Sequence, residues 1–297
     1  MVFLSNEMRR NLIGFPARCY DVKIYISGTS GFIGGYLLAN IPETLAGTRI
    51  LRRDDPIDSL LNSPSDDQTI VIVNCASPTP NIITHPCEWI TPSRVWINKL
   101  CDAVQQNKNI LIIHLSSTRI FGERPVGEIT ETTPPNPTCP YGIEKGWMEK
   151  TLLERQQKGF FSLNIIRLPA VLGNSCHPNF ITNLRDSGRT CKPISITPPD
   201  TPYNAVVHVR AIRDYIIYKI MTFQHAKART AVDNLCSINP IPLREVIRLA
   251  AGEHMVEKYS AMTSLAGGYW IRPSNEIENL MARWTTERTI LEYLKND

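Results

Sequence analysis

Short runs of apolar, mostly β-branched residues alternate with amphipathic segments up to residue 172. The runs with the length of strands buried on both faces are Val22–Ser27, Arg49–Leu51, Thr69–Cys75, Asn109–Leu115 and Phe161–Leu168. Between them, the spacing of apolar residues predicts helices at Ile33–Ile41, Val95–Gln106 and Tyr141–Gln157. Strands and helices that alternate in this way form a parallel sheet with helices on both faces, so we predict a doubly wound α/β fold.

The composition excludes several classes of protein. The chain has 297 residues, of which 42% are hydrophobic and 20% charged, as in a globular protein. No apolar run approaches the roughly 20 residues of a membrane-spanning helix, and the Lys and Arg residues are scattered, so we predict neither membrane insertion nor nucleic-acid binding. The cysteines form no C-x-x-C pair, which predicts no metal site and fits a reducing cytoplasm.

A glycine-rich loop joins the first predicted strand to the first predicted helix. It reads Gly28-Thr29-Ser30-Gly31-Phe32-Ile33-Gly34. Gly28 permits a sharp turn, Gly31 lets the backbone approach a pyrophosphate, and Gly34 allows close packing of the helix. The N–H groups at the start of the helix then face that phosphate, so this spacing predicts a dinucleotide site on a Rossmann-type sheet.

The residues at the end of the second predicted strand indicate whether the dinucleotide is NAD or NADP. An acidic residue there accepts the ribose hydroxyls of NAD, whereas an arginine accommodates the 2′-phosphate of NADP. In this chain Arg52 and Arg53 follow the strand, and Asp54 comes only after them. We therefore predict a preference for NADP(H), with NAD(H) as the alternative.

The predicted elements divide the chain into unequal parts. Residues 1–20 form an N-terminal extension, and 21–172 form the dinucleotide-binding Rossmann domain. Proline and glycine become frequent afterwards, which predicts a smaller, mainly substrate-binding lobe over 173–297. Residues 205–223 return to the Rossmann core, because Val206–Val209 has the composition of a further core strand and a helix follows at Ile212–Phe223.

A serine, a tyrosine and a lysine form the candidate catalytic group. Ser117 follows the fourth strand, and Tyr141 and Lys145 lie four residues apart on the helix that follows it. This spacing places both side chains on one helix face. A nearby ammonium lowers the pKa of a tyrosine, which then exchanges a proton with a substrate oxygen held by the serine. Tyr215 and Lys219 have the same spacing, but no strand-end serine precedes them at a matching distance.

The sequence resembles the extended short-chain dehydrogenase/reductase family of nucleotide-sugar epimerases, dehydratases and reductases. The matching segments are Gly28–Gly34, Asn74–Ser77, Ser116–Gly122, Tyr141–Lys145, Ile165–Gly173, Val207–Val209 and Arg272–Pro273. The resemblance implies that the cofactor contacts the glycine-rich loop (Gly28, Ser30, Gly31, Phe32, Ile33 and Gly34), Ala76, Ser77, Tyr141, Lys145, Pro169 and Val171. It implies that the substrate contacts Ser117, Thr118, Asn179, Asn204 and Arg272.

Some positions differ from the family pattern. Thr118 and Arg119 stand where the dehydratases carry an acidic pair, which disfavours dehydration. Asn204 stands where many epimerases carry an arginine, and Ser93 replaces an asparagine that is usual in the helix before the catalytic strand.

We predict an NADP(H)-dependent oxidoreductase that reduces a keto-sugar nucleotide. An epimerase that uses the same residues is one alternative, and a non-catalytic dinucleotide-binding sensor is another. The expected partner is a small molecule, a nucleotide sugar. The resemblance leaves open a homodimer formed through two helices, one of which bears Tyr141.

Overall fold

The computed structural model describes residues 22–42, 45, 49–57, 68–77, 91–104, 109–122, 125–159, 161–192, 194–223, 229–260 and 268–295. The predicted extension over residues 1–20 lies outside the described residues. No helix in these ranges is long and apolar enough to cross a membrane.

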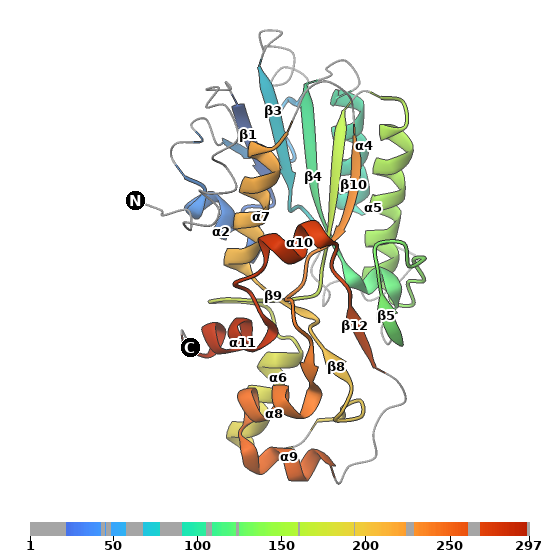
Figure 1. Cartoon of the computed structure of the whole chain (residues 1–297). Coiled ribbons are helices and arrows are strands. Elements are labelled where there is room, and N and C mark those ends of the chain that lie inside the picture. Colours follow the sequence, from blue (N-terminus) through green and yellow to red (C-terminus); the bar gives the residue numbers. More distant parts are fainter. Residues whose placement is uncertain are drawn as a thin grey trace.

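A six-stranded parallel sheet forms the upper half of the molecule (Figure 1). Its strands are β1 (Val22–Ser27), β2 (Arg49–Leu51), β3 (Thr69–Asn74), β4 (Ile110–Ser117), β6 (Ser162–Leu168) and β10 (Thr230–Asn234). Their order is β10-β6-β4-β3-β1-β2. The chain therefore starts at β1, adds β2 beside it at one edge, and then reverses direction to add β3, β4, β6 and β10 in turn on the other side, which confirms the predicted doubly wound α/β fold.

Helices cover both faces of this sheet because its strands are apolar on both sides. Along β1, Ile24 and Ile26 belong to one core cluster, whereas Tyr25 between them belongs to another. The first cluster includes residues of α2 (Phe32–Asn40) and α7 (Val209–Met221), and the second includes residues of α4 (Pro92–Ala103) and α5 (Pro140–Gln156). The period of two in the strand side chains thus produces two separate cores.

The remaining elements form a second lobe and its connections. They are the 3₁₀ helix η2 (Thr118–Phe121), β5 (Gly127–Ile129), β7 (Ala170–Leu172), α6 (Phe180–Thr190), β8 (Pro202–Tyr203), β9 (Val206–His208), β11 (Ile241–Pro242), α8 (Leu243–Ala251), α9 (Glu253–Ser260), β12 (Tyr269–Ile271), α10 (Asn275–Leu280) and α11 (Thr286–Leu294). Helices α6, α8 and α9 lie together below the sheet in Figure 1. A third apolar cluster joins α6, α8 and α11.

The chain crosses between the two parts more often than the sequence predicts. Helix α7 does pack on the large sheet, but β9 before it pairs with β7 in a separate two-stranded sheet. The strand that completes the large sheet is instead β10, which pairs with β6 and was not predicted. Short segments such as β9 and β10 carry too little periodicity to show which sheet they join.

Candidate active site

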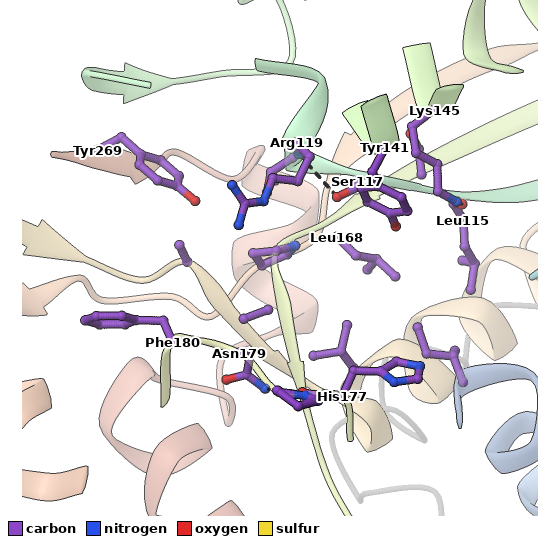
Figure 2. Close-up of a pocket in the computed structure, with 18 of the residues that line it drawn as sticks. Leu115, Ser117, Arg119, Tyr141, Lys145, Leu168, His177, Asn179, Phe180 and Tyr269 are labelled. Carbon is purple, nitrogen blue, oxygen red and sulfur yellow. Dashed lines mark hydrogen bonds between the residues drawn. The ribbon is translucent and has the colours of Figure 1, made fainter. Parts of the chain in front are cut away.

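A cavity of about 560 Å³ lies between the carboxyl ends of the sheet strands and the second lobe. Figure 2 shows side chains from both parts facing this space. Ligands of open α/β sheets bind at the carboxyl ends of the strands, and this volume suits a small molecule. From the Rossmann part the lining includes Gly28, Gly31, Phe32, Ile33, Gly34, Cys75, Ser77, Ser117, Thr118, Arg119, Tyr141, Lys145, Pro169 and Val171. From the second lobe it includes His177, Asn179, Phe180, Ser195, Thr197, Thr201, Tyr203 and Tyr269.

The glycine-rich loop has the shape that a pyrophosphate requires. Gly28 has a φ of +73°, and a Cβ there would lie 2.7 Å from the backbone nitrogen of Ala76. A Cβ at Gly34 would collide with the carbonyl of Gly28, so helix α2 approaches the loop as closely as glycine permits. Gly31 is the N-cap of α2 and offers no side chain to the first-turn N–H groups, which leaves room for an anion at this helix end. The loop therefore fits a dinucleotide.

The other predicted cofactor residues surround this loop in different ways. Phe32, Ile33 and Ser77 line the cavity, as do Pro169 and Val171 at the end of β6. Ala76 is buried, with its backbone nitrogen against Gly28, and Ser30 is exposed; neither residue lines the cavity.

The two arginines predicted to select the cofactor lie at the end of β2. Arg52 and Arg53 are exposed. The backbone N–H of Arg52 donates to Asp55 Oδ2 at 2.7 Å, and Lys99 donates to the carbonyls of Arg53 and Asp55 at 2.7 and 2.8 Å. These contacts hold the backbone of the turn and leave both guanidinium groups exposed to solvent.

Ser117, Tyr141 and Lys145 come together at the end of β4, as Figure 2 shows. The Tyr141 hydroxyl and Ser117 share a side-chain hydrogen bond. The Lys145 amine donates to the carbonyl of Leu115 at 2.7 Å and lies 5.9 Å from the centre of the Tyr141 ring. The tyrosine hydroxyl and the serine thus face the same cavity, with the lysine buried behind them.

Two local features position the helix that carries Tyr141 and Lys145. Pro140 occupies the first turn of α5, and the N-cap residue Cys139 accepts a hydrogen bond from Gly142 N–H. Gly142 is essential for the packing, because a Cβ there would collide with the carbonyl oxygen of Arg119 in η2. The start of α5 therefore lies directly against the turn that follows Ser117.

The electrostatics of Tyr141 differ from the prediction. Burial raises its pKa to about 12, and the groups that oppose this rise are the Ser117 hydrogen bond and the Arg119 charge. Lys145 is not among them, so the predicted lowering of the tyrosine pKa by this lysine is not observed. The Lys145 ammonium is itself disfavoured, because burial lowers its pKa to about 8 while Cys75, Glu149 and Glu144 act in the opposite direction.

The second tyrosine and lysine pair has a structural role. The Tyr215 hydroxyl donates to the buried Asp233 at 2.6 Å, and the Lys219 amine lies 3.5 Å from the same carboxylate. This cluster ties α7 to the edge strand β10 and does not line the cavity.

The predicted substrate residues are only partly brought to the cavity. Thr118 lines it. Asn179 also lines it, but its side-chain oxygen caps α6 by accepting from the N–H groups of Ile181 and Thr182.

Asn204 and Arg272, two of the predicted substrate residues, are not among the residues that line the cavity. The fully buried amide of Asn204 donates to the carbonyls of Ser237 and Ile271 and accepts from Ile271 N–H, so it holds backbone segments together. Arg272 is 65% exposed and forms an ion pair of 2.6 Å with Glu128. The diphosphate contact expected from these two residues stays a prediction.

Several polar residues of the lining, among them Arg119, His177 and Tyr269, were not predicted as site residues. Arg119 extends into the cavity between Tyr141 and Tyr269, and His177 faces it from the second lobe (Figure 2). The sequence did contain one signal, since Arg119 occupies a position where the resembled dehydratases carry an acid. His177 lies on an irregular connection and Tyr269 on the short strand β12, and neither belongs to a motif, so only the tertiary structure places them.

Comparisons with known proteins agree with this geometry. The family model for the NAD-dependent epimerase/dehydratase family matches residues 24–217. Among solved structures, UDP-glucuronic acid 4-epimerase from Bacillus cereus, in complex with NAD, has a TM-score of 0.66 and 15% identity, covering 92% of this chain and 96% of that chain. No curated protein matches the sequence significantly.

Two further solved structures have the same fold. A UDP-glucose 4-epimerase has a TM-score of 0.64 and 16% identity, with coverage of 92% of this chain and 96% of that one. The dTDP-glucose 4,6-dehydratase from Bacillus anthracis, in complex with NAD, has the same scores and coverage. The family model covers well over half of the sequence, which confirms the predicted resemblance and enzyme class. The chain belongs to the NAD-dependent epimerase/dehydratase family.

Proposed function

We propose that the protein epimerises a nucleotide-linked sugar with a nicotinamide dinucleotide. The observation that carries this proposal is the hydrogen-bonded pair of Ser117 and Tyr141 in a cavity that runs from the glycine-rich loop to the second lobe. Similar folds bind such substrates, since one of the matched structures contains UDP-glucuronic acid and NAD and another contains UDP-glucose and NAD.

Ser117 and Tyr141 have distinct tasks in this reaction. Ser117 binds and orients the reacting hydroxyl or carbonyl oxygen of the sugar. Tyr141 takes the hydroxyl proton when the carbon is oxidised and gives it back when the ketone is reduced. The bound nicotinamide supplies the chemistry of accepting and returning a hydride. Epimerisation follows when the ketone is reduced on its opposite face, so proton, hydride and oxidation state balance over the cycle.

Dehydration is not supported by the composition of the cavity. Elimination of water from a sugar needs a general acid for the leaving hydroxyl, and the resembled dehydratases carry an acidic pair for this purpose. None of the described residues that line this cavity is Asp or Glu. Thr118 and Arg119 occupy the two positions of that pair.

For the cofactor, we propose a preference for the 2′-phosphate of NADP(H). The exposed guanidinium groups of Arg52 and Arg53 support it, because a charge-assisted phosphate contact contributes about 1.5–3 kcal/mol. Calorimetric titration with NADPH and NADH tests this preference, and a double Arg52→Ala, Arg53→Ala variant should lose it. Equal affinities in the unmodified protein would contradict the proposal.

Reduction of a keto-sugar nucleotide is the second candidate. Two observations favour it: the exposed Arg52 and Arg53, and the raised pKa of Tyr141, which is about 12 and keeps the phenol protonated at neutral pH. A protonated phenol is ready to donate to a carbonyl, as reduction requires, whereas epimerisation must first ionise it.

The test separates the two reactions by their products. The purified protein is incubated with UDP-glucose or UDP-glucuronic acid and either NAD⁺ or NADP⁺, and the sugar is followed by NMR. A new epimer without net change in cofactor absorbance supports epimerisation. Stoichiometric NADPH consumption with a UDP-4-keto-sugar, and no epimer, supports reduction instead. Tyr141→Phe should abolish either reaction while leaving cofactor affinity nearly unchanged, because the phenol proton acts in the chemical step.

A further inference from the structure

Arg119, Thr118 and Tyr269 form a polar wall at one side of the cavity. All three line it, and Figure 2 shows the Arg119 guanidinium between the Tyr141 ring and the Tyr269 hydroxyl. Tyr269 shares a side-chain hydrogen bond with Thr118, and the Arg119 charge acts on both tyrosines. This wall therefore presents one permanent positive charge with hydroxyl groups beside it, which is a suitable lining for an anion.

The backbone of Arg119 is held firmly relative to the trio. Its N–H donates to Ser117 Oγ at 3.2 Å, the dashed line in Figure 2. Its carbonyl accepts from Gly122 N–H at 3.1 Å and lies where any side chain at position 142 would stand. The Arg119 side chain is therefore attached to a backbone that is held in place, two residues after Ser117.

This position determines which part of the substrate Arg119 meets. If the reacting oxygen of a sugar contacts Ser117 and Tyr141, a substituent on an adjacent ring carbon would lie within reach of the Arg119 side chain, because the backbone of Arg119 is bonded to Ser117. A dinucleotide at the glycine-rich loop would occupy the Rossmann side of the cavity, so the nucleotide of the substrate would extend toward the residues of the second lobe that line the other side. In this arrangement the guanidinium would meet an anion on the sugar itself.

We propose that Arg119 binds a carboxylate on the sugar ring, so that the preferred substrate is a nucleotide-linked uronic acid. The inference rests on the proposed function and adds the substrate class. The guanidinium matches a carboxylate with two parallel hydrogen bonds, which a primary alcohol at the same carbon cannot provide. Arg119 is exposed. Solvent screening therefore places the expected preference for the carboxylate at the lower end of about ten- to a hundredfold in affinity.

The test compares two substrates that differ only in this group. UDP-glucuronic acid and UDP-glucose are titrated by calorimetry into the Tyr141→Phe protein saturated with NAD(P)⁺, so that no turnover occurs. We expect UDP-glucuronic acid to bind about tenfold more tightly or better. Adding Arg119→Met should remove this preference by weakening UDP-glucuronic acid alone, and Arg119→Lys should keep part of it.

A matched control removes an arginine elsewhere. Arg248 lies on α8, is 45% exposed and pairs with Glu245 outside the cavity lining. Arg248→Met should leave both affinities unchanged. Far-ultraviolet circular dichroism and thermal melting check that Arg119→Met folds. If it does not fold, the comparison of UDP-glucuronic acid with UDP-glucose in the Tyr141→Phe protein, which keeps Arg119, still tests the inference.

The outcomes separate this inference from the proposed function. If UDP-glucose and UDP-glucuronic acid bind equally well, or if Arg119→Met weakens both to the same degree, Arg119 recognises no sugar carboxylate and the inference is wrong, while the nucleotide-sugar proposal stands. If neither nucleotide sugar binds, both fail together.

Discussion

Replacing Lys145 by methionine is expected to stabilise the protein at pH 7, although it removes a residue of the candidate site. Burial of the ammonium lowers its pKa from 10.5 to about 8. This shift corresponds to about 3 kcal/mol by which the native structure disfavours the charged form. The variant also loses the hydrogen bond to the Leu115 carbonyl, which costs about 1 kcal/mol. We therefore expect a net gain of about 2 kcal/mol in the free energy of unfolding.

The pH dependence of this gain in stability follows from the direction of the pKa shift of Lys145. Below pH 8 the lysine is charged in both the native and the unfolded state, and its destabilisation is fully present. Between pH 8 and 10.5 the native protein has released the proton while the unfolded chain still binds it, so the unmodified protein becomes more stable as the pH rises. The methionine variant lacks this increase, and its advantage should disappear toward pH 10.5.

Urea unfolding of both proteins at pH 7 and at about pH 9.5 measures the effect. Lys150→Met is the matched control on the same helix, because the Lys150 side chain is 76% exposed. Its effect should stay within about 0.5 kcal/mol at either pH. The reasoning is refuted if Lys145→Met is less stable than the unmodified protein at pH 7, or if the difference between them is the same at both pH values.

Three further substitutions test the packing around the site. Gly142→Ala should lower kcat at least about tenfold, because the added Cβ displaces the start of α5 from the Arg119 carbonyl and misplaces the catalytic helix; unchanged kinetics would contradict this. Asn204→Ala should cost about 2–4 kcal/mol in urea unfolding, because it leaves buried backbone groups without partners, and cofactor affinity should hardly change. Glu149→Gln should cost about 3–5 kcal/mol in the free energy of unfolding, because it leaves the buried Arg167 without its charge partner. In the unmodified protein, Arg167 Nη2 and Glu149 Oε2 lie 2.9 Å apart. A loss below about 1 kcal/mol would show that the pair is dispensable.

Much of the Rossmann part could be predicted from the sequence because its signals are local. The β-branched runs of β1, β3, β4 and β6 identify buried strands wherever they occur. Gly28 is required by its positive φ, and Gly34 by its close approach to the carbonyl of Gly28. Ser117 was identifiable because it lies at the end of a strand, and the carboxyl ends of parallel strands share one edge of the sheet. The spacing of Tyr141 and Lys145 places them on one face of any helix.

The surroundings of these residues could not be predicted, because each depends on segments that are distant in the sequence. The pKa of Tyr141 is set by how deeply its hydroxyl is buried and by the charge of Arg119, and neither can be obtained from a spacing of four residues. A second tyrosine and lysine with that same spacing serve only to fix α7 against Asp233.

The sequence by itself therefore determined the fold class, the dinucleotide loop and the candidate catalytic group, since strand periodicity, glycine turns and helical spacing act over a few residues. Only the tertiary structure decided which polar side chains face the substrate. Asn204 and Arg119 are both polar residues beside matching motifs. The Asn204 side chain donates its hydrogen bonds to the carbonyls of Ser237 and Ile271, whereas the Arg119 side chain extends into the cavity. The difference arises because burial and hydrogen-bond partners belong to packed neighbours that the chain brings together from far apart.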